Sequence, residues 1–398
     1  MRSTSCGILV IAATACGFTQ AALAQAPARP PQATLDAWLT PFPKAPADTF
    51  IRQGVRTGSL VTRADCEASG DKERARFVYV EAMGRGACIR YHLSAEAFPG
   101  KTAAVYLPGD KGGFRIAWRN GQYEMLPEEL IPRAGQPAGE AKAPDMARKL
   151  GDPDRNQSFS RAVATRARVP AILLSRQGTD GSSGWVALRR SRWEVDITNR
   201  ALDAIKARHG IEKLHLVGQS GGGHLVGALA ALRNDVTCAV AGSAPLAFDP
   251  RSFYLSDKVP APQRFFNPVD QAETIARKPG LKLMLVTDGR DTRVFVDRQA
   301  VFVRAMAKYG ARTPQFFVTA GDALSHGVTA YSVAALRWCV EGKSADEIAV
   351  EIAKMNAQVL ERRLNATRER QKPQVQPDPG VRSQAPAGAG DPGEPVPD

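Results

Sequence analysis

The sequence has 398 residues and a formal net charge of +13 at pH 7, from 53 Lys and Arg against 40 Asp and Glu. The basic residues are scattered from Arg52 to Arg370 and are not interleaved with aromatic residues in a stripe, which argues against a specific nucleic-acid surface. None of the six cysteines forms a C-x-x-C pair, so metal and redox roles for them are disfavoured. The sequence indicates neither a metal nor a cofactor.

Residues 1–24 have the pattern of a bacterial secretory signal. Arg2 precedes an apolar stretch over residues 6–18, and the small-residue sequence Ala22-Leu23-Ala24 follows it. The apolar stretch is too short to span a bilayer. We therefore expect cleavage near Ala24 and a periplasmic or secreted protein with no stable membrane span. A lipoprotein signal at Cys16 is the alternative, although the residues before it lack the usual leucine.

Two further segments are rich in proline or glycine. Residues 25–49 form a Pro-rich linker and residues 373–398 a Pro/Gly-rich tail, and neither buries enough apolar surface to offset chain entropy. Residues 50–342 are long enough for one large α/β domain or two ordinary ones, and they contain no internal repeat. A capping box at residues 344–347 predicts a final helix within 343–372, with apolar residues along one face.

Strand and helix patterns alternate along the central region. Apolar runs at 77–80 and 88–91, separated by glycines, predict a hairpin. Six further strand patterns lie at 103–107, 171–174, 214–217, 238–241, 281–286 and 315–318. Helical patterns lie at 159–168, 192–208, 223–232, 296–309 and 329–340. This alternation predicts βαβ units and a mostly parallel sheet with helices on both faces.

The most informative motif follows the strand pattern at 214–217. The sequence Gly218-Gln219-Ser220-Gly221-Gly222 is a G-x-S-x-G motif between a strand and a helix. Small residues on either side of the serine permit a strained turn that exposes its hydroxyl group. Ser220 is therefore a candidate nucleophile. A simple glycine-rich turn and a phosphate-binding loop are the alternatives.

From about residue 50 to residue 342 the chain resembles the α/β hydrolases, in particular the branch of dienelactone hydrolases and prolyl-oligopeptidase-like serine hydrolases. The resemblance rests on the hairpin that precedes the parallel strands and on the serine motif after the fifth strand. It implies an α/β-hydrolase fold: an eight-stranded, mostly parallel sheet with an antiparallel start and insertions after strands three and six. It also implies catalytic residues in the order Ser, Asp or Glu, His.

The resemblance assigns the other members of a triad. His326 lies in the polar loop after the last strand and is the one histidine of five that follows the later acid candidates. The acid is expected at Asp291, which begins a segment similar to the family's D-x-x-V, with Asp288 second and Asp249 third. His224, four residues after the serine, is expected to pack or to contact substrate rather than to act as a base.

An oxyanion hole is the next implied feature. One donor is the backbone N–H of Gly221, and the second comes from the loop after strand three. This loop reads Pro108-Gly109-Asp110 where the family usually has His-Gly, and the N–H of Asp110 is the expected donor. The loop at 176–184 resembles the family's R-G-x-G-x-S stretch and is either an alternative donor or a structural turn.

Two insertions interrupt the expected core, at residues 112–157 and 246–279. The second contains four aromatic residues that would either line an acyl or aryl pocket in a cap or form a small core of the insertion. These residues are Phe253, Tyr254, Phe265 and Phe266.

Four cysteines remain after the signal segment. The implied strand order places Cys238 at the start of strand six and Cys339 at the end of the helix after strand eight, so both lie at the lower edge of the sheet. We therefore expect a Cys238–Cys339 disulfide and a Cys66–Cys88 disulfide, as suits an oxidising compartment.

Together these features predict a secreted serine hydrolase that cleaves an ester, thioester or peptide-like bond of a small molecule or peptide through an acyl-enzyme. A peptidase of the prolyl-oligopeptidase-like type and a non-catalytic binding protein on the same fold are the alternatives. No propeller pattern precedes the hydrolase-like region, which favours an esterase over a peptidase.

Overall fold

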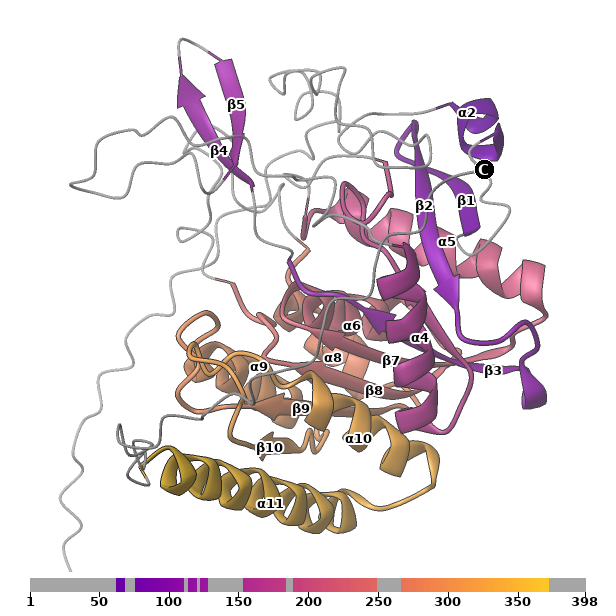
Figure 1. Cartoon of the computed structure of the whole chain (residues 1–398). Coiled ribbons are helices and arrows are strands. Elements are labelled where there is room, and N and C mark those ends of the chain that lie inside the picture. Colours follow the sequence, from indigo (N-terminus) through magenta and orange to yellow (C-terminus); the bar gives the residue numbers. More distant parts are fainter. Residues whose placement is uncertain are drawn as a thin grey trace, which may run out of the picture.

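The computed structural model describes residues 62–68, 76–110, 114–119, 122–127, 153–183, 189–248 and 266–371. They form an eight-stranded sheet and a separate two-stranded hairpin, with helices packed around the larger sheet (Figure 1). The predicted signal, linker and C-terminal tail, at residues 1–24, 25–49 and 373–398, lie outside the described residues.

The large sheet has the strand order β1-β2-β6-β3-β7-β8-β9-β10. In this order the strands are Arg76–Ala82, Arg85–Leu93, Ala171–Leu174, Thr102–Leu107, Lys213–Gln219, Val236–Gly242, Lys282–Thr287 and Gln315–Phe317. The β1–β2 and β2–β6 pairs are antiparallel. Every pair from β6 to β10 is parallel. The predicted mostly parallel sheet with an antiparallel start is therefore confirmed.

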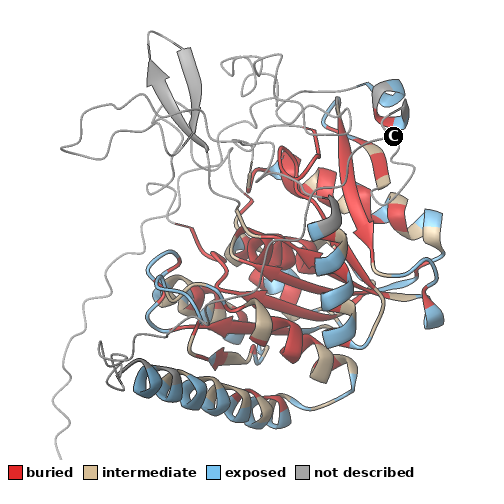
Figure 2. Ribbon diagram, viewed as in Figure 1, coloured by how far each residue is buried: buried red, intermediate tan, exposed pale blue. Residues whose placement is uncertain are grey.

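Helices cover both faces of this sheet. Successive residues of a strand point to opposite faces, and on β3 Val105 packs into one apolar cluster while Ala104 packs into another. The first cluster includes residues of α5 (Arg192–His209), α6 (Gly221–Leu232), α8 (Ala272–Ala276) and α9 (Val296–Lys308). The second includes residues of α4 (Pro153–Ala167), α10 (Thr329–Val340) and α11 (Ala345–Gln371). The strands are buried between these layers (Figure 2), which explains their continuous apolar sequences.

Several elements differ from the sequence-based expectation. Helix α4 begins at Pro153 rather than at residue 159, because its first turn is polar and shows no apolar periodicity. The insertion after β3 contains an unpredicted hairpin of β4 (Phe114–Arg119) and β5 (Gln122–Pro127). The short elements α2 (Arg63–Ala68), η1 (Pro99–Lys101) and η5 (Pro268–Gln271) also lacked a recognisable pattern.

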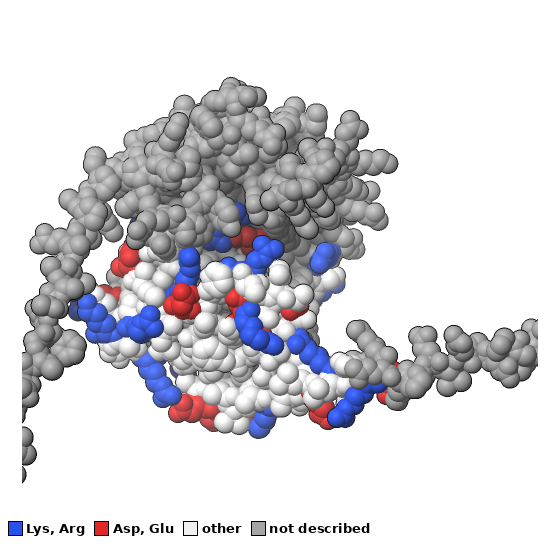
Figure 3. All heavy atoms as spheres, turned by 90° about the vertical axis from the view of Figure 1, so that its left-hand side faces the viewer, with Lys and Arg blue, Asp and Glu red and all other residues white. Residues whose placement is uncertain are grey.

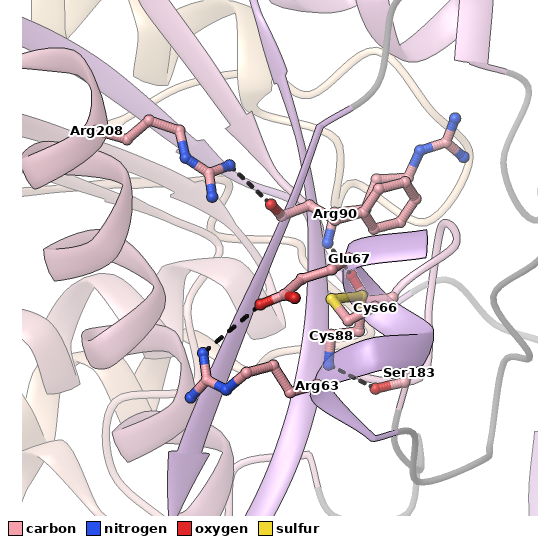
Figure 4. The surroundings of a disulfide bond; sticks show 9 residues. Arg63, Cys66, Glu67, Cys88, Arg90, Ser183 and Arg208 are labelled. Carbon is pink, nitrogen blue, oxygen red and sulfur yellow. Dashed lines mark hydrogen bonds and ion pairs between the residues drawn. A yellow bond between two sulfur atoms is a disulfide. The ribbon is translucent and has the colours of Figure 1, made fainter. Parts of the chain in front are cut away.

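Both expected cysteine pairs are bonded. The Cys66–Cys88 disulfide joins α2 to β2, and the Cys238–Cys339 disulfide joins β8 to the end of α10. Around the first bridge, the backbone N–H of Cys88 donates a 2.8 Å hydrogen bond to the hydroxyl of Ser183 (Figure 4). Disulfides of this kind are typical of proteins from oxidising compartments.

Helix α11 packs along the second face of the sheet. The predicted capping box is present, since the side chains of Ser344 and Glu347 each accept a hydrogen bond from the other residue's backbone N–H. Ile348 and Ile352 are buried in the second apolar cluster, whereas Leu364 is 60% exposed. None of the described helices is long and apolar enough to cross a membrane.

Charged residues are mixed on the described surface. On the face drawn in Figure 3, Lys and Arg side chains are interspersed with Asp and Glu rather than gathered in one continuous basic patch. Elsewhere on the described surface, ion pairs join different elements, such as Lys101 with Glu212 and Arg312 with Asp346. This distribution agrees with the scattered charge of the sequence.

Candidate active site

Ser220 occupies the sharp turn between β7 and α6. Its backbone has φ 55° and ψ −120°, a conformation that costs a non-glycine residue about 1–3 kcal/mol. Glycine is required two residues later, because a Cβ at Gly222 would collide with the carbonyl group of Leu107. Every residue between 214 and 231 is buried except Ser220, which is partly exposed. The turn therefore presents one serine at the carboxyl end of the fifth strand of the large sheet.

This turn and the strand order together define the architecture. The carboxyl end of β7 lies at the centre of the sheet, between β3 and β8, and the serine turn leads directly into a buried helix. A strained serine turn in this position has the backbone geometry of a nucleophile elbow. The fold is that of the α/β hydrolases. In this fold the loops after the later strands carry the remaining catalytic groups, and the predicted acid and base lie in two such loops.

His326 and Asp291 are hydrogen-bonded. His326 Nδ1 lies 2.8 Å from Asp291 Oδ2, and the Asp291 side chain is fully buried while that of His326 is 19% exposed. A carboxylate only accepts, so Nδ1 donates and Nε2 is the nitrogen left for proton transfer. The other carboxylate oxygen accepts the backbone N–H groups of Arg293 (2.8 Å) and Val294 (2.9 Å). Asp291 is thus fixed on one side and aimed at the histidine on the other.

The second acid candidate has a different role. Asp288 pairs with Arg290 at 2.8 Å and accepts a 2.8 Å hydrogen bond from the backbone N–H of Ala320. Burial alone would raise the pKa of Asp288, but the hydrogen bonds from Arg290 and Ala320 lower it below its usual value. Asp288 therefore fastens the loop after β10 to the end of β9. The third candidate, Asp249, lies outside the described residues.

Gln219, which the sequence did not single out, connects the elbow to the histidine loop. Its Nε2 donates a 2.6 Å hydrogen bond to the carbonyl oxygen of His326. Its Oε1 accepts hydrogen bonds of 3.3 Å from the backbone of Val328 and from the hydroxyl of Thr329. Because Gln219 directly precedes Ser220, these contacts hold the histidine loop against the elbow. Its variable position within G-x-S-x-G gives no sequence signal for this contact.

Helix α11 supports the same loop from the outside. Asn356 Oδ1 accepts the backbone N–H of Thr319 at 2.8 Å, and Arg363 donates to the carbonyl oxygen of Ala320. The Asn356 side chain also binds the hydroxyl of Tyr331 on α10 at 3.0 Å. No role for this helix could be predicted from the sequence, and the structure places it behind the loop that carries His326.

The two expected oxyanion donors flank the serine. Gly221 is the first residue of α6, immediately after Ser220. The loop after β3 approaches the elbow closely, since a Cβ at Gly109 would lie 3.1 Å from the carbonyl oxygen of Gln219 and 3.3 Å from Ser220 Cβ. Asp110, the next residue, begins a network of charged side chains.

This network joins four segments. Asp110 pairs with Arg176 and with Arg190, and Arg176 also binds Glu194 through Nη2 (2.7 Å) and Nε (2.8 Å). The side chain of Arg176 is 3% exposed and that of Glu194 is fully buried. Burial would raise the pKa of Asp110, but Arg190, Arg176 and Arg189 together hold it well below its usual range. Asp110 is therefore an ionised carboxylate beside the elbow.

The loop that contains Arg176 is otherwise fastened to β2. The Ser183 N–H donates to the carbonyl oxygen of Cys88 at 2.9 Å, and the Ser182 hydroxyl accepts the N–H of Arg90 at 2.9 Å. These contacts support the structural reading of residues 176–183 over the reading as an oxyanion donor. Residue 184 lies outside the described residues.

His224 packs in the interior. It is fully buried, its Nε2 lies 2.6 Å from the carbonyl oxygen of Phe266, and its ring is 5.3 Å from that of Phe248. Burial first, and then the nearby Arg190 and Arg176, lower the pKa of His224 to about 3. Its predicted packing role agrees with this position.

The predicted aromatic pocket is only partly described. Phe266 is 6% exposed and belongs to the first apolar cluster, so it contributes to the core rather than to a pocket wall. Phe253, Tyr254 and Phe265 lie outside the described residues. Within this insertion, the Phe248 N–H donates to Asn267 Oδ1 at 3.1 Å, so described residues on either side of 249–265 are in contact.

No protein-family model matches the chain, and a search of curated proteins gave no significant match. Among solved structures, the chain is similar to an acylaminoacyl peptidase of Pyrococcus horikoshii, with 14% identity, a TM-score of 0.41 and coverage of 67% of this chain and 39% of the peptidase. It is similar to an esterase of Pyrococcus furiosus, with 13% identity, a TM-score of 0.40 and coverage of 75% and 97%. An arylesterase has 15% identity, a TM-score of 0.41 and coverage of 72% and 87%. The chain thus spans less than half of the peptidase's length and most of the esterases' length.

Proposed function

We propose that this protein is a secreted serine hydrolase that cleaves carboxylic esters through Ser220, His326 and Asp291. The observation that carries the proposal is the 2.8 Å hydrogen bond between His326 Nδ1 and Asp291, in a loop that Gln219 ties to the serine elbow. Three groups that are distant in the sequence are thereby assembled at adjoining loops. A histidine fixed by a carboxylate, in a loop tied to a serine elbow, supports a mechanism of nucleophilic acyl transfer.

The proposed reaction begins when Ser220 Oγ attacks the ester carbonyl carbon and His326 Nε2 accepts the hydroxyl proton. Asp291 holds the imidazole in the correct tautomer and stabilises the imidazolium. The negative oxygen of the tetrahedral intermediate accepts hydrogen bonds from the backbone N–H groups of Gly221 and Asp110. Collapse breaks the bond to the alcohol, which takes the proton from His326 and leaves an acyl-enzyme.

Water completes the proposed cycle. His326 removes a proton from the water molecule as it attacks the acyl carbonyl, and the second tetrahedral intermediate occupies the same oxyanion hole. Its collapse returns the proton to Ser220 and releases the carboxylic acid. No metal, cofactor or redox partner takes part in either half of this scheme.

Secretion is the second part of the proposal. Residues 1–24 have the signal pattern, and the two disulfides suit an oxidising compartment. The N-terminal sequence of the protein recovered from a periplasmic or culture fraction tests this directly. A start near Gln25 is the expected result, and recovery of the uncleaved chain from the cytoplasm would contradict it.

Labelling with a fluorophosphonate probe tests the chemistry. The purified protein should be labelled on Ser220, and Ser220→Ala should abolish the labelling. Ser243→Ala is a suitable control, because Ser243 also has a positive φ, 42°, and follows the neighbouring strand β8. Absence of labelling in the folded protein would refute the proposal and favour a non-catalytic binding protein.

A panel of substrates tests which type of bond the protein cleaves. Nitrophenyl esters of short and long acyl chains are compared with peptide nitroanilides at equal concentration. Faster turnover of the esters is expected. Preferential cleavage of the anilides would replace the esterase by a peptidase on the same triad.

A further inference from the structure

The charged network of Asp110, Arg176, Arg190 and Glu194 lies at the candidate oxyanion hole. Its members come from the loop after β3, the loop after β6, the turn before α5 and the first turn of α5. Arg176 is the central member, since one edge of its guanidinium binds Asp110 and another binds Glu194. Such a planar fork holds two carboxylates in fixed directions at once, a geometry that the compact ammonium group of a lysine does not impose.

The absence of a side chain at Gly221 leaves the space that this network occupies. A Cβ at Gly221 would collide with Asp110 Oδ1 and with Arg176 Nη1, so the ion pair lies directly against the backbone at the start of α6. This is the residue whose N–H is proposed to bind the oxyanion. The glycine is therefore needed for the charged pair as well as for the turn.

An acidic side chain in this position is unfavourable for the proposed chemistry by itself. The tetrahedral intermediate develops a negative charge next to the Gly221 N–H, and an uncompensated carboxylate in contact with this residue would repel it. Two unit charges about 6 Å apart at an effective dielectric constant of about 20 alter a rate by about 100-fold. Two guanidinium groups on Asp110 remove this penalty.

We propose that Arg176 is a positioning residue of the proposed hydrolase site. It neutralises Asp110 beside the oxyanion hole, and it holds the loop at 108–110 so that the Asp110 N–H faces the reacting carbonyl oxygen. Glu194 fixes Arg176 from the opposite side, and Arg190 shares the neutralisation. The inference rests on the proposed function, because it assigns a role within that reaction.

A purely structural role for the network and the proposed positioning role predict different reaction rates, although both predict a loss of stability. Removal of one partner from a buried ion pair destabilises a protein in either case, because the other charge is left unpaired. Only the proposed role makes the rate at Ser220 depend on the sign of the charge at position 110. Removal of that charge should therefore rescue a variant that lacks Arg176.

The test compares Arg176→Gln, Arg176→Lys and the double variant Arg176→Gln/Asp110→Asn. Arg233→Gln is the matched control, because Arg233 is 7% exposed, pairs with Asp235 and Asp203, and lies at the opposite end of the strands, before β8. Each protein is measured for urea unfolding, for the rate constant of fluorophosphonate labelling at Ser220, and for kcat and KM on a nitrophenyl ester.

Arg176→Gln should lower the labelling rate and kcat by about 100-fold and change KM by less than threefold. The labelling rate and kcat of the double variant should be at least tenfold higher than those of Arg176→Gln. The values for Arg176→Lys should lie between those of Arg176→Gln and of the double variant. Arg233→Gln should lose stability but label at the wild-type rate. If Arg176→Gln does not fold, Arg176→Lys and the double variant carry the comparison, because both keep the net charge of the four-residue network unchanged: the proposal requires both to exceed one tenth of the wild-type rate.

Two outcomes overturn the inference alone. One is a folded Arg176→Gln that labels at the wild-type rate. The other is a double variant that is as slow as the single variant. If the wild-type protein is not labelled at Ser220, the proposed function fails and the inference fails with it.

Discussion

Gln219 Nε2 donates a 2.6 Å hydrogen bond to the carbonyl oxygen of His326. The residue before the candidate nucleophile thus holds the backbone of the candidate base. Because the same amide also accepts hydrogen bonds from Val328 and Thr329, three residues at the end of the histidine loop and the start of α10 contact one side chain of the elbow. The backbone that carries the imidazole of His326 is consequently held from within the motif.

Gln219→Leu should therefore lower kcat by about 10- to 100-fold, since small misplacements of catalytic groups have effects of this size. Gln219→Glu keeps both acceptor contacts but loses the donor toward His326, and it should show a loss in the same range. Ester hydrolysis measured well below the unfolding temperature gives the comparison.

Gln157→Leu is the matched control for this experiment. Gln157 also donates to a backbone carbonyl, that of Leu93, but at the end of β2 opposite to the serine. It should lose stability and retain kcat. Equal kcat values for the Gln219 and Gln157 variants would contradict a specific role for Gln219.

Asp291→Asn should reduce kcat by about 10³- to 10⁴-fold, because an amide no longer fixes the histidine tautomer or stabilises the imidazolium. Asp288→Asn should keep kcat within threefold and lower stability, because it weakens the contacts with Arg290 and Ala320. Steady-state kinetics and thermal unfolding of both variants separate the two carboxylates. A larger kcat loss for Asp288→Asn would reverse the assignment.

The two disulfides should contribute unequally to stability. The Cys238–Cys339 bridge closes a sequence separation of 101 residues and the Cys66–Cys88 bridge one of 22. Loop-closure entropy then gives contributions of about 5 and about 3 kcal/mol. Replacement of each pair by two alanines, followed by urea unfolding without reductant, measures the difference. A greater loss for the Cys66–Cys88 pair would show that chain entropy does not dominate.

The free energy of unfolding should fall as the pH falls below about 6.5. Burial lowers the pKa of His224 to about 3 and that of His215 to about 4, from an ordinary value of 6.5. Between these values the unfolded chain binds protons that the folded protein does not bind, so acid favours unfolding. Each histidine contributes about 1.4 kcal/mol per pH unit.

His224→Gln removes one of these contributions. Over the range from pH 4.5 to pH 6, the slope of unfolding free energy against pH should decrease by about 1.4 kcal/mol per unit relative to the wild type. The absolute stability should also be lower, because the packing against Phe248 and Phe266 changes. An unchanged slope would mean that His224 is protonated in the folded protein.

The sheet was predictable because each of its strands has a clear local pattern. The strand predicted at 171–174 has the same bounds as β6, and the helix predicted at 329–340 has those of α10. Buried parallel strands are apolar on both faces, so short continuous runs identify them. Helix α4 was predicted too short because its first residues are polar, and polar turns carry no periodic signal.

Only those residues of the candidate site that belong to a recognisable motif or order along the chain could be predicted from the sequence. Ser220, Asp291 and His326 follow from a spacing and an order along the chain. Gln219 and Arg176 do not, since each acts through contacts with segments up to 110 residues away. Such contacts depend on tertiary geometry: Arg176 begins the stretch similar to R-G-x-G-x-S and Gln219 lies within G-x-S-x-G, but neither local pattern reveals the partner of its side chain.

At position 220, the backbone conformation favours glycine, whereas the proposed chemistry needs the hydroxyl group of a serine. The φ of Ser220, 55°, lies in a region that glycine adopts without strain and that strains the backbone of residues with a side chain. A Ser220→Gly substitution would relieve this strain and remove the hydroxyl in one step. Under the proposed chemistry, Ser220→Gly is therefore more stable than the wild type and inactive. A serine that persists at this position in spite of the strain would indicate selection for catalysis.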